Sequence, residues 1–162
     1  MAMTIKTEGL TELSQMLTTL GDKAQDVASG SLYDGAGVVG DAFSSAINGI
    51  QTEPFHWAKY GETRKPSPDE KAALIGKSGI AKFNKNGGEV DTLIGITGNA
   101  GYAMVGKKLK PVRMIARSIN SGTSFMQKQP VFRRAASQSQ GKAKAAIVSK
   151  ADEMFNEIIN SK

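Results

Sequence analysis

The residues that could carry out chemistry in this chain are few and scattered. His56 is the single histidine, and the 162 residues include no cysteine. These facts exclude thiolate metal sites and cysteine nucleophiles, and they leave too few imidazoles for a usual zinc site. Catalysis by His56 would need a nucleophile that the fold brings beside it, and the neighbouring sequence offers none. We therefore expect no catalytic residue, no metal site, no cofactor and no small-molecule substrate.

Two other patterns have simple structural interpretations. Gly98-Asn99-Ala100-Gly101 has the glycines of a phosphate-binding loop, but it lacks the Lys-Ser/Thr that such a loop needs, so we interpret it as a turn. The carboxylate pairs Asp69-Glu70 and Asp152-Glu153 are adjacent in sequence. Adjacent residues do not face each other on a helix, and we interpret both pairs as solvated surface.

Basic residues form the strongest chemical signal. Residues 101–162 contain 12 Lys/Arg against 3 Asp/Glu, whereas residues 1–100 contain 9 against 12. One cluster lies within eleven residues: Lys107, Lys108, Lys110, Arg113 and Arg117. The cluster is either a solvated face or a contact site for DNA phosphates or an acidic partner. Few aromatic residues interleave it, which disfavours a platform for stacking bases.

The elements that position these residues follow from hydrophobic spacing. We expect a short strand at residues 3–7, and a helix from about 9 to 20 that ends at Gly21. A long helix should follow from about 22 to 49. Four glycines fall inside it: Gly30, Gly35, Gly37 and Gly40. Each costs roughly 1 kcal/mol relative to Ala in a helix, so we expect another backbone to pack closely against them.

The middle of the chain predicts a loop and then strands. Residues 51–79 form a long loop that we expect to contact a partner, and its candidate contact residues are Phe55, His56, Trp57 and Tyr60. Strands at 80–83, 90–96 and 102–105, with a turn at Asn86-Gly87-Gly88, predict an antiparallel meander. Residues 111–119 suit a strand or a short helix. The last helix should run from about 130 to 160, and the whole forms one α+β domain over residues 1–162.

One segment is distinctive. Residues 114–135 read Met-Ile-Ala-Arg-Ser-Ile-Asn-Ser-Gly-Thr-Ser-Phe-Met-Gln-Lys-Gln-Pro-Val-Phe-Arg-Arg-Ala. This stretch resembles the signature of the tail-completion (head–tail joining, or neck) proteins of long-tailed, siphovirus-type bacteriophages. In that family a Gly-Thr-Ser turn precedes Gln-Pro, an aromatic residue, Arg and Ala at the start of the final helix. The order of the other elements, from the Gly9-Leu10-Thr11-Glu12-Leu13 helix onwards, is similar too.

The resemblance implies a structural virion protein of the phage neck, made in the host cytoplasm and active without enzymatic chemistry. It implies a homo-oligomeric ring, hexameric from tail symmetry, around the channel through which the genome DNA passes. Its implied partners are the tail terminator, head-closure and tail-tube or tape-measure proteins. No apolar run suggests a membrane partner. Two alternatives stay open: a tail terminator or minor tail protein, and a free-standing, non-specific DNA-binding protein.

Within the distinctive segment, the expected structural and interface residues are Gly122, Thr123, Pro130, Phe132 and Arg133. Gly122 can take a positive φ and turn the chain. Pro130 fixes the entry to the last helix. We expect Phe132 to anchor the first turn of that helix to the sheet, so that Phe132→Ala gives insoluble or monomeric protein.

Overall fold

The computed structural model describes residues 10–82, 84–86, 89–96 and 100–160. It begins with one uninterrupted helix, α1 (Leu10–Asn48). The prediction that Gly21 ends a first helix is wrong, because helical hydrogen bonding continues through this residue and no atom outside the helix crowds it. The strand expected at residues 3–7 and the tips of the turns at 87–88 and 98–99 lie outside the described residues.

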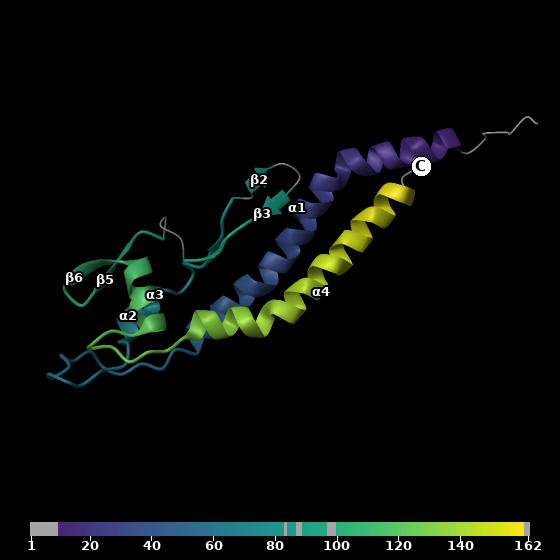
Figure 1. The fold of residues 1–162 in the computed structure, drawn as a ribbon. Coiled ribbons are helices and arrows are strands. Elements are labelled where there is room, and N and C mark those ends of the chain that lie inside the picture. The colour runs from purple at the N-terminus through teal and green to yellow at the C-terminus, as the bar shows by residue number, and fades with distance from the viewer. Residues whose placement is uncertain (1–9, 83, 87–88, 97–99, 161–162) are drawn as a thin grey trace, which may run out of the picture.

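The last helix, α4 (Val131–Asn160), lies antiparallel to α1 along most of its length (Figure 1). The glycines explain how closely the two approach. A Cβ atom added to Gly30 would lie 2.8 Å from the sulfur of Met154, and one added to Gly35 would collide with Ile147. Nothing lies within 4 Å of such an atom at Gly37 or Gly40. Close packing is therefore confirmed for Gly30 and Gly35 and not for the other two. The close atoms belong to side chains of α4, and the one backbone atom among them is the Ala143 carbonyl oxygen, 3.1 Å from a Cβ at Gly35.

Short antiparallel ladders connect the long helices. Their strands are β1 (Gly79–Ile80), β2 (Asn84–Asn86), β3 (Glu89–Asp91), β4 (Ile94–Gly95), β5 (Tyr102–Val105) and β6 (Lys108–Pro111). β1 pairs with β4 and β2 with β3, which together make one irregular hairpin against α1, while β5 pairs with β6. The α+β class with long terminal helices is confirmed, but β5 does not continue a meander. A two-residue turn that begins at Gly106 (φ 60°) pairs it with β6 instead.

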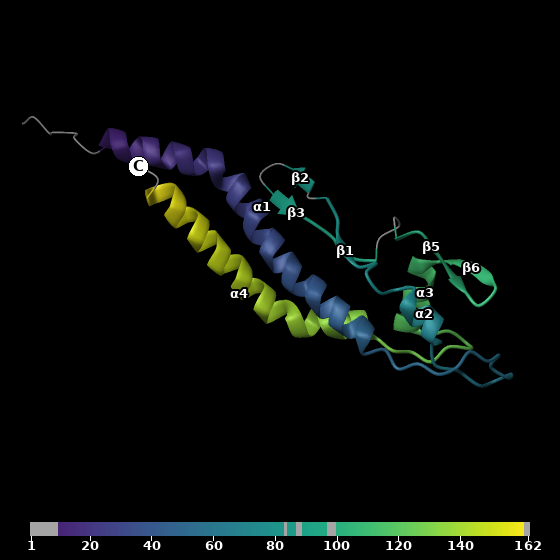
Figure 2. The same ribbon diagram turned by 180° about the vertical axis from the view of Figure 1, so that it is seen from behind.

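Two shorter helices complete the fold. α3 (Val112–Ser121) resolves the ambiguity over residues 111–119, and its buried side chains recur at helical spacing: Val112, Ile115, Ala116 and Ile119. α2 (Pro68–Ala72) lies inside the segment expected to be loop. Leu74, Ile47 and Ile50 join the α3 face in the main core. This core therefore lies where the end of α1 meets α2 and α3, away from the α1 N-terminus (Figure 2). Within the described residues, no helix is both long and apolar enough to cross a membrane.

Candidate interaction groove

A groove of about 770 Å³ opens between the loop at 52–67, the turn of the β5–β6 hairpin and the loop after α3. We call it the interaction groove. Three aromatic rings line it, from Phe55, Trp57 and Phe125, and Ala58 and Val105 add apolar surface. All charged residues of its lining are cations: Arg64, Lys107, Lys108 and Lys110. The volume falls in the usual range for ligand sites in proteins.

Two of the three aromatic residues, Phe55 and Trp57, contact each other and neighbouring cations. The rings of Phe55 and Trp57 meet edge to face, with centroids 5.3 Å apart. The Arg64 guanidinium lies 4.8 Å from the centre of the Phe55 ring, and the Lys108 ammonium lies 5.9 Å from the centre of the Trp57 ring. Such contacts orient exposed rings and are worth up to about 1 kcal/mol each at exposed sites. Trp57 still leaves 78% of its surface exposed.

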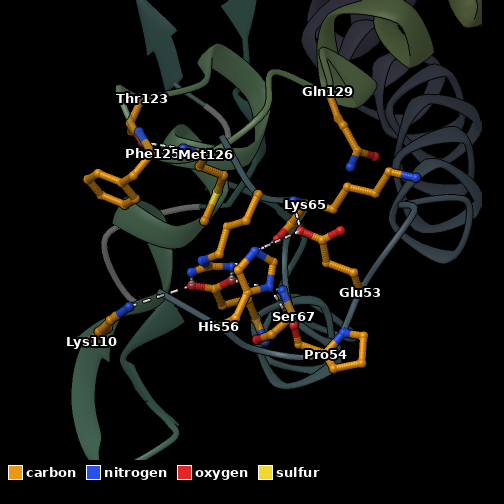
Figure 3. A network of polar contacts seen from close by, with 12 residues as sticks. Glu53, Pro54, His56, Lys65, Ser67, Lys110, Thr123, Phe125, Met126 and Gln129 are labelled. Carbon is orange, nitrogen blue, oxygen red and sulfur yellow. Dashed lines mark hydrogen bonds and ion pairs between the residues drawn. The ribbon is translucent and has the colours of Figure 1, made fainter. Parts of the chain in front are cut away.

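The base of the groove is a buried ion pair. Arg64 donates two hydrogen bonds to Glu70, from Nη1 to Oε2 at 2.7 Å and from Nη2 to Oε1 at 2.8 Å. Lys110 reaches the same carboxylate from the β5–β6 hairpin, with its Nζ 3.5 Å from Oε1 (Figure 3). The Glu70 carboxylate thus joins the helix α2, the preceding loop and the hairpin, and it sets the distance between the two walls of the groove.

Local sequence explains why Glu70 is buried and charged. Ser67 caps α2 by accepting a hydrogen bond from the Glu70 N–H, and the Ser67 N–H donates to Glu70 Oε2. This reciprocal pair is a capping box, with Pro68 at the first helical position. Burial alone would raise the pKa of Glu70. The hydrogen bonds from Arg64 and Ser67, with the positive charges of Arg64 and Lys110, outweigh it and hold that pKa below its ordinary value.

The distinctive segment, residues 114–135, is hydrogen-bonded through its backbone to the groove residue Arg64. The Arg64 N–H donates to the Phe125 carbonyl at 3.0 Å, and the Gln127 N–H donates to the Arg64 carbonyl at 2.8 Å. Thr123 closes the turn over residues 123–126, because its Oγ1 accepts a hydrogen bond from the Met126 N–H. Gly122 has φ 75°, and a Cβ there would meet Lys128 at 3.0 Å. Gly122 thus has the positive φ expected of it, and Thr123 contributes a hydrogen bond to the turn that follows.

A second set of bonds ties the groove to the helix pair. Gln129 accepts from the Gln51 N–H through Oε1 and donates through Nε2 to the Gln51 carbonyl. Lys71 donates from Nζ to the carbonyls of Asn48 and Ile50, at the end of α1. Because both ends of the loop are fixed in this way, the position of the groove follows the position of the helices.

The candidate residues from the sequence divide between the groove and other surfaces. Lys107, Lys108, Lys110, Phe55 and Trp57 line it together. The remaining candidates lie outside its lining: Arg113, Arg117, His56 and Tyr60 are exposed, and Arg133 lines a separate shallow hollow near the start of α4. His56 contacts the Pro54 carbonyl at 3.2 Å (Figure 3).

Pro130 and Phe132 lie where the last helix begins. The Pro130 carbonyl accepts from the Arg134 N–H, so this proline immediately precedes the first turn of α4 as expected. Phe132 is half-buried against the main core, and the ring contact that the structure gives it is with a helix and not with a strand. Its ring packs edge to face on Phe43 of α1, with centroids 5.5 Å apart. The reason is that α4 lies against α1, so the first inward-facing side chain of α4 meets the last turns of that helix.

Two features of the groove differ from the sequence interpretation. Glu70 is 1% exposed, so the reading of Asp69-Glu70 as solvated surface is wrong for Glu70. The Ser67-Pro68-Asp69-Glu70 capping box is the signal that could have found it. The lysines also have aromatic neighbours, but these come from the distant segments around Phe55 and Phe125 and therefore escaped a search along the basic stretch.

The outer face of the β5–β6 hairpin forms a second surface. Cross-strand register places Met104 opposite Leu109, and Tyr102 lies two residues before Met104 on the same face. All three are exposed, by 59%, 62% and 67% respectively. The other face carries the buried Val105 and the groove lysines Lys108 and Lys110. The hairpin thus separates an apolar outer face from a cationic inner one.

No protein-family model, no curated protein and no solved structure matches this chain. In the part of the chain that the structure describes, no cluster of His, Cys, Asp or Glu could hold a metal ion.

Proposed function

We propose that this chain is a structural protein of the phage neck, which completes the tail and joins it to the head as a subunit of an oligomeric ring. The observation that carries the proposal is the apolar outer face of the β5–β6 hairpin, formed by Tyr102, Met104 and Leu109. Large apolar side chains that are exposed together on one face are a feature of protein–protein contact sites. A subunit that functions by packing against copies and neighbours needs such a face.

The distinctive segment supports the proposal of a neck location through its resemblance and its position in the fold. Residues 114–135 resemble the neck-protein signature, and the same residues connect α3 to α4 and hold the base of the interaction groove. A segment that fixes both the last helix and a docking surface determines how a subunit presents itself to its neighbours. This combination favours a virion neck subunit over a free-standing DNA-binding protein, because contact with DNA phosphates does not need an exposed apolar face on the hairpin.

The test is deletion of the gene from the phage or prophage genome that encodes the chain, followed by electron microscopy of the lysate. The proposal predicts DNA-filled heads and separate tails that do not join, and restoration of joined particles by a plasmid copy. Intact infectious particles without the protein would overturn it. Tails of abnormal length, or a labelled copy at the distal tip, would instead support the alternative of a tail terminator or minor tail protein.

A further inference from the structure

The interaction groove combines an apolar lining with cationic side chains, and the proposed neck function does not by itself explain this combination. Its lining is mostly apolar, from Phe55, Trp57, Val105 and Phe125, yet every charged side chain in it is a cation. Two of these cations are already compensated, because Arg64 and Lys110 both contact the Glu70 carboxylate. Lys107 and Lys108 have no carboxylate partner among the described residues, and both are exposed residues of the groove lining.

We propose that this groove binds a segment of a partner protein in which acidic residues flank a large apolar side chain. The apolar side chain enters between Trp57 and Phe125, and the flanking carboxylates pair with Lys107 and Lys108. Burying an exposed Trp against an apolar anchor is the usual origin of a binding hot spot, and charge pairs at the rim add specificity and speed of association. The inference rests on the proposed function in one respect, that the occupant is a protein.

The geometry of the rings favours a peptide over nucleic acid. Single strands bind by stacking their bases on free aromatic faces. Here Arg64 covers a face of Phe55, and Lys108 lies over Trp57. The two rings are also inclined by 80°, so they do not offer parallel surfaces to successive bases. An aliphatic or aromatic side chain needs only the apolar hollow, which leaves the Arg64–Glu70 pair intact.

Trp57 makes the proposal directly testable, because it is the single tryptophan of the chain. The purified full chain is titrated with four probes while Trp57 emission and its quenching by acrylamide are recorded. The probes are a short tryptophan-free peptide with Glu and Asp around Phe and Leu, the same peptide with Gln and Asn for the acids, the same peptide with Ser for the apolar residues, and an oligothymidylate.

The proposal predicts that the acidic-apolar peptide shifts Trp57 emission to shorter wavelength and shields it from acrylamide. Its Kd should be about tenfold or more below that of either matched peptide. The double variant Lys107→Glu/Lys108→Glu should weaken this binding by about tenfold or more. The matched variant Lys142→Glu/Lys144→Glu, at exposed positions of α4, changes the net charge equally and should bind as the wild type does.

Three results would overturn the proposal. The acidic-apolar peptide could bind no better than its matched controls, the two double variants could lose affinity equally, or the oligothymidylate could bind more tightly and lose affinity only in the Lys107/Lys108 variant. The last result would assign the groove to nucleic acid. Each outcome concerns the isolated chain, so it is distinguishable from failure of the neck function, which the gene deletion tests separately.

Discussion

Arg64 and Glu70 form a bidentate ion pair in which both side chains are almost fully buried, at 4% and 1% exposure. The pair joins the loop at 52–67 to the helix α2. Buried ion pairs add little stability compared with apolar residues of the same shape, but the loss of one partner leaves the other charge uncompensated. We therefore interpret this pair as a device that fixes the shape of the groove.

The substitution Glu70→Gln should lower the free energy of unfolding by about 3–5 kcal/mol, because it leaves the Arg64 guanidinium buried without a counter-charge. Urea unfolding followed by circular dichroism measures the change. The matched control is Glu153→Gln, which removes a carboxylate from the exposed Lys150–Glu153 pair on α4 and should leave the urea midpoint unchanged. Equal shifts in the two variants would contradict a specific role for the buried pair.

The depressed pKa of Glu70 makes a prediction for acid. Folding favours the ionised carboxylate, so this contribution to stability is complete above the ordinary Glu pKa of about 4.5 and decreases as the pH falls through the lower folded value. Urea midpoints measured from pH 6 to pH 3, a range chosen around that pKa, should decrease more steeply in the wild type than in Glu70→Gln. Parallel decreases in the two proteins would show that other carboxylates cause the acid sensitivity.

The sequence predicts these long-range contacts poorly because their partners are far apart in the chain. Helical spacing alone was enough to predict most of α1 and all of α4. The cost of glycine in a helix predicted close packing at four glycines, and the structure has it at Gly30 and Gly35. By contrast, the sequence around Glu70 does not indicate that Arg64 and Lys110 both contact its carboxylate. The local capping box indicates that the Glu70 side chain bonds back to Ser67 and is not simply solvated, but it says nothing of Arg64 or Lys110.

The α1–α4 contact gives a sharper test of the glycines. Gly35→Ala should destabilise the protein by about 1–3 kcal/mol, because its Cβ has no room beside Ile147 and the Ala143 carbonyl. Gly40→Ala is the matched control on the same helix, where nothing lies within 4 Å of an added Cβ. It should stabilise by up to about 1 kcal/mol through helix propensity. Thermal unfolding compares the two, and stabilisation by both would contradict the close packing.

Phe132 tests the start of α4. Phe132→Ala removes the ring that packs on Phe43 and should cost about 2–3 kcal/mol, below the range for a fully buried Phe because the ring is half-buried. We expect insoluble protein or a monomer, measured by expression yield and analytical ultracentrifugation. Val148→Ala, on an exposed position of the same helix, should behave as the wild type does. Wild-type assembly by the Phe132 variant would count against the anchoring role.

Pairing of strands was the least predictable part of the fold. The glycines at 86–88 and 98–101 suggested two successive turns of one meander, and the turn at Gly106 was not recognised. A two-residue turn brings neighbours in sequence together at small entropic cost. β5 therefore pairs with β6, and not with the strand expected at residues 90–96. This pairing matters for the candidate site, because it creates both the apolar outer face and the cationic wall of the groove.

The proposal that the chain acts by assembling is tested most directly by its native mass, determined alone and in a mixture with a phage tail terminator, the partner that the resemblance implies. The account predicts a closed ring, six subunits by the symmetry that the resemblance implies, at least in the presence of that partner. It also predicts that Met104→Lys/Leu109→Lys, on the apolar face of the hairpin, prevents the ring while the variant remains folded. A wild-type chain that stays monomeric in both conditions would contradict the account.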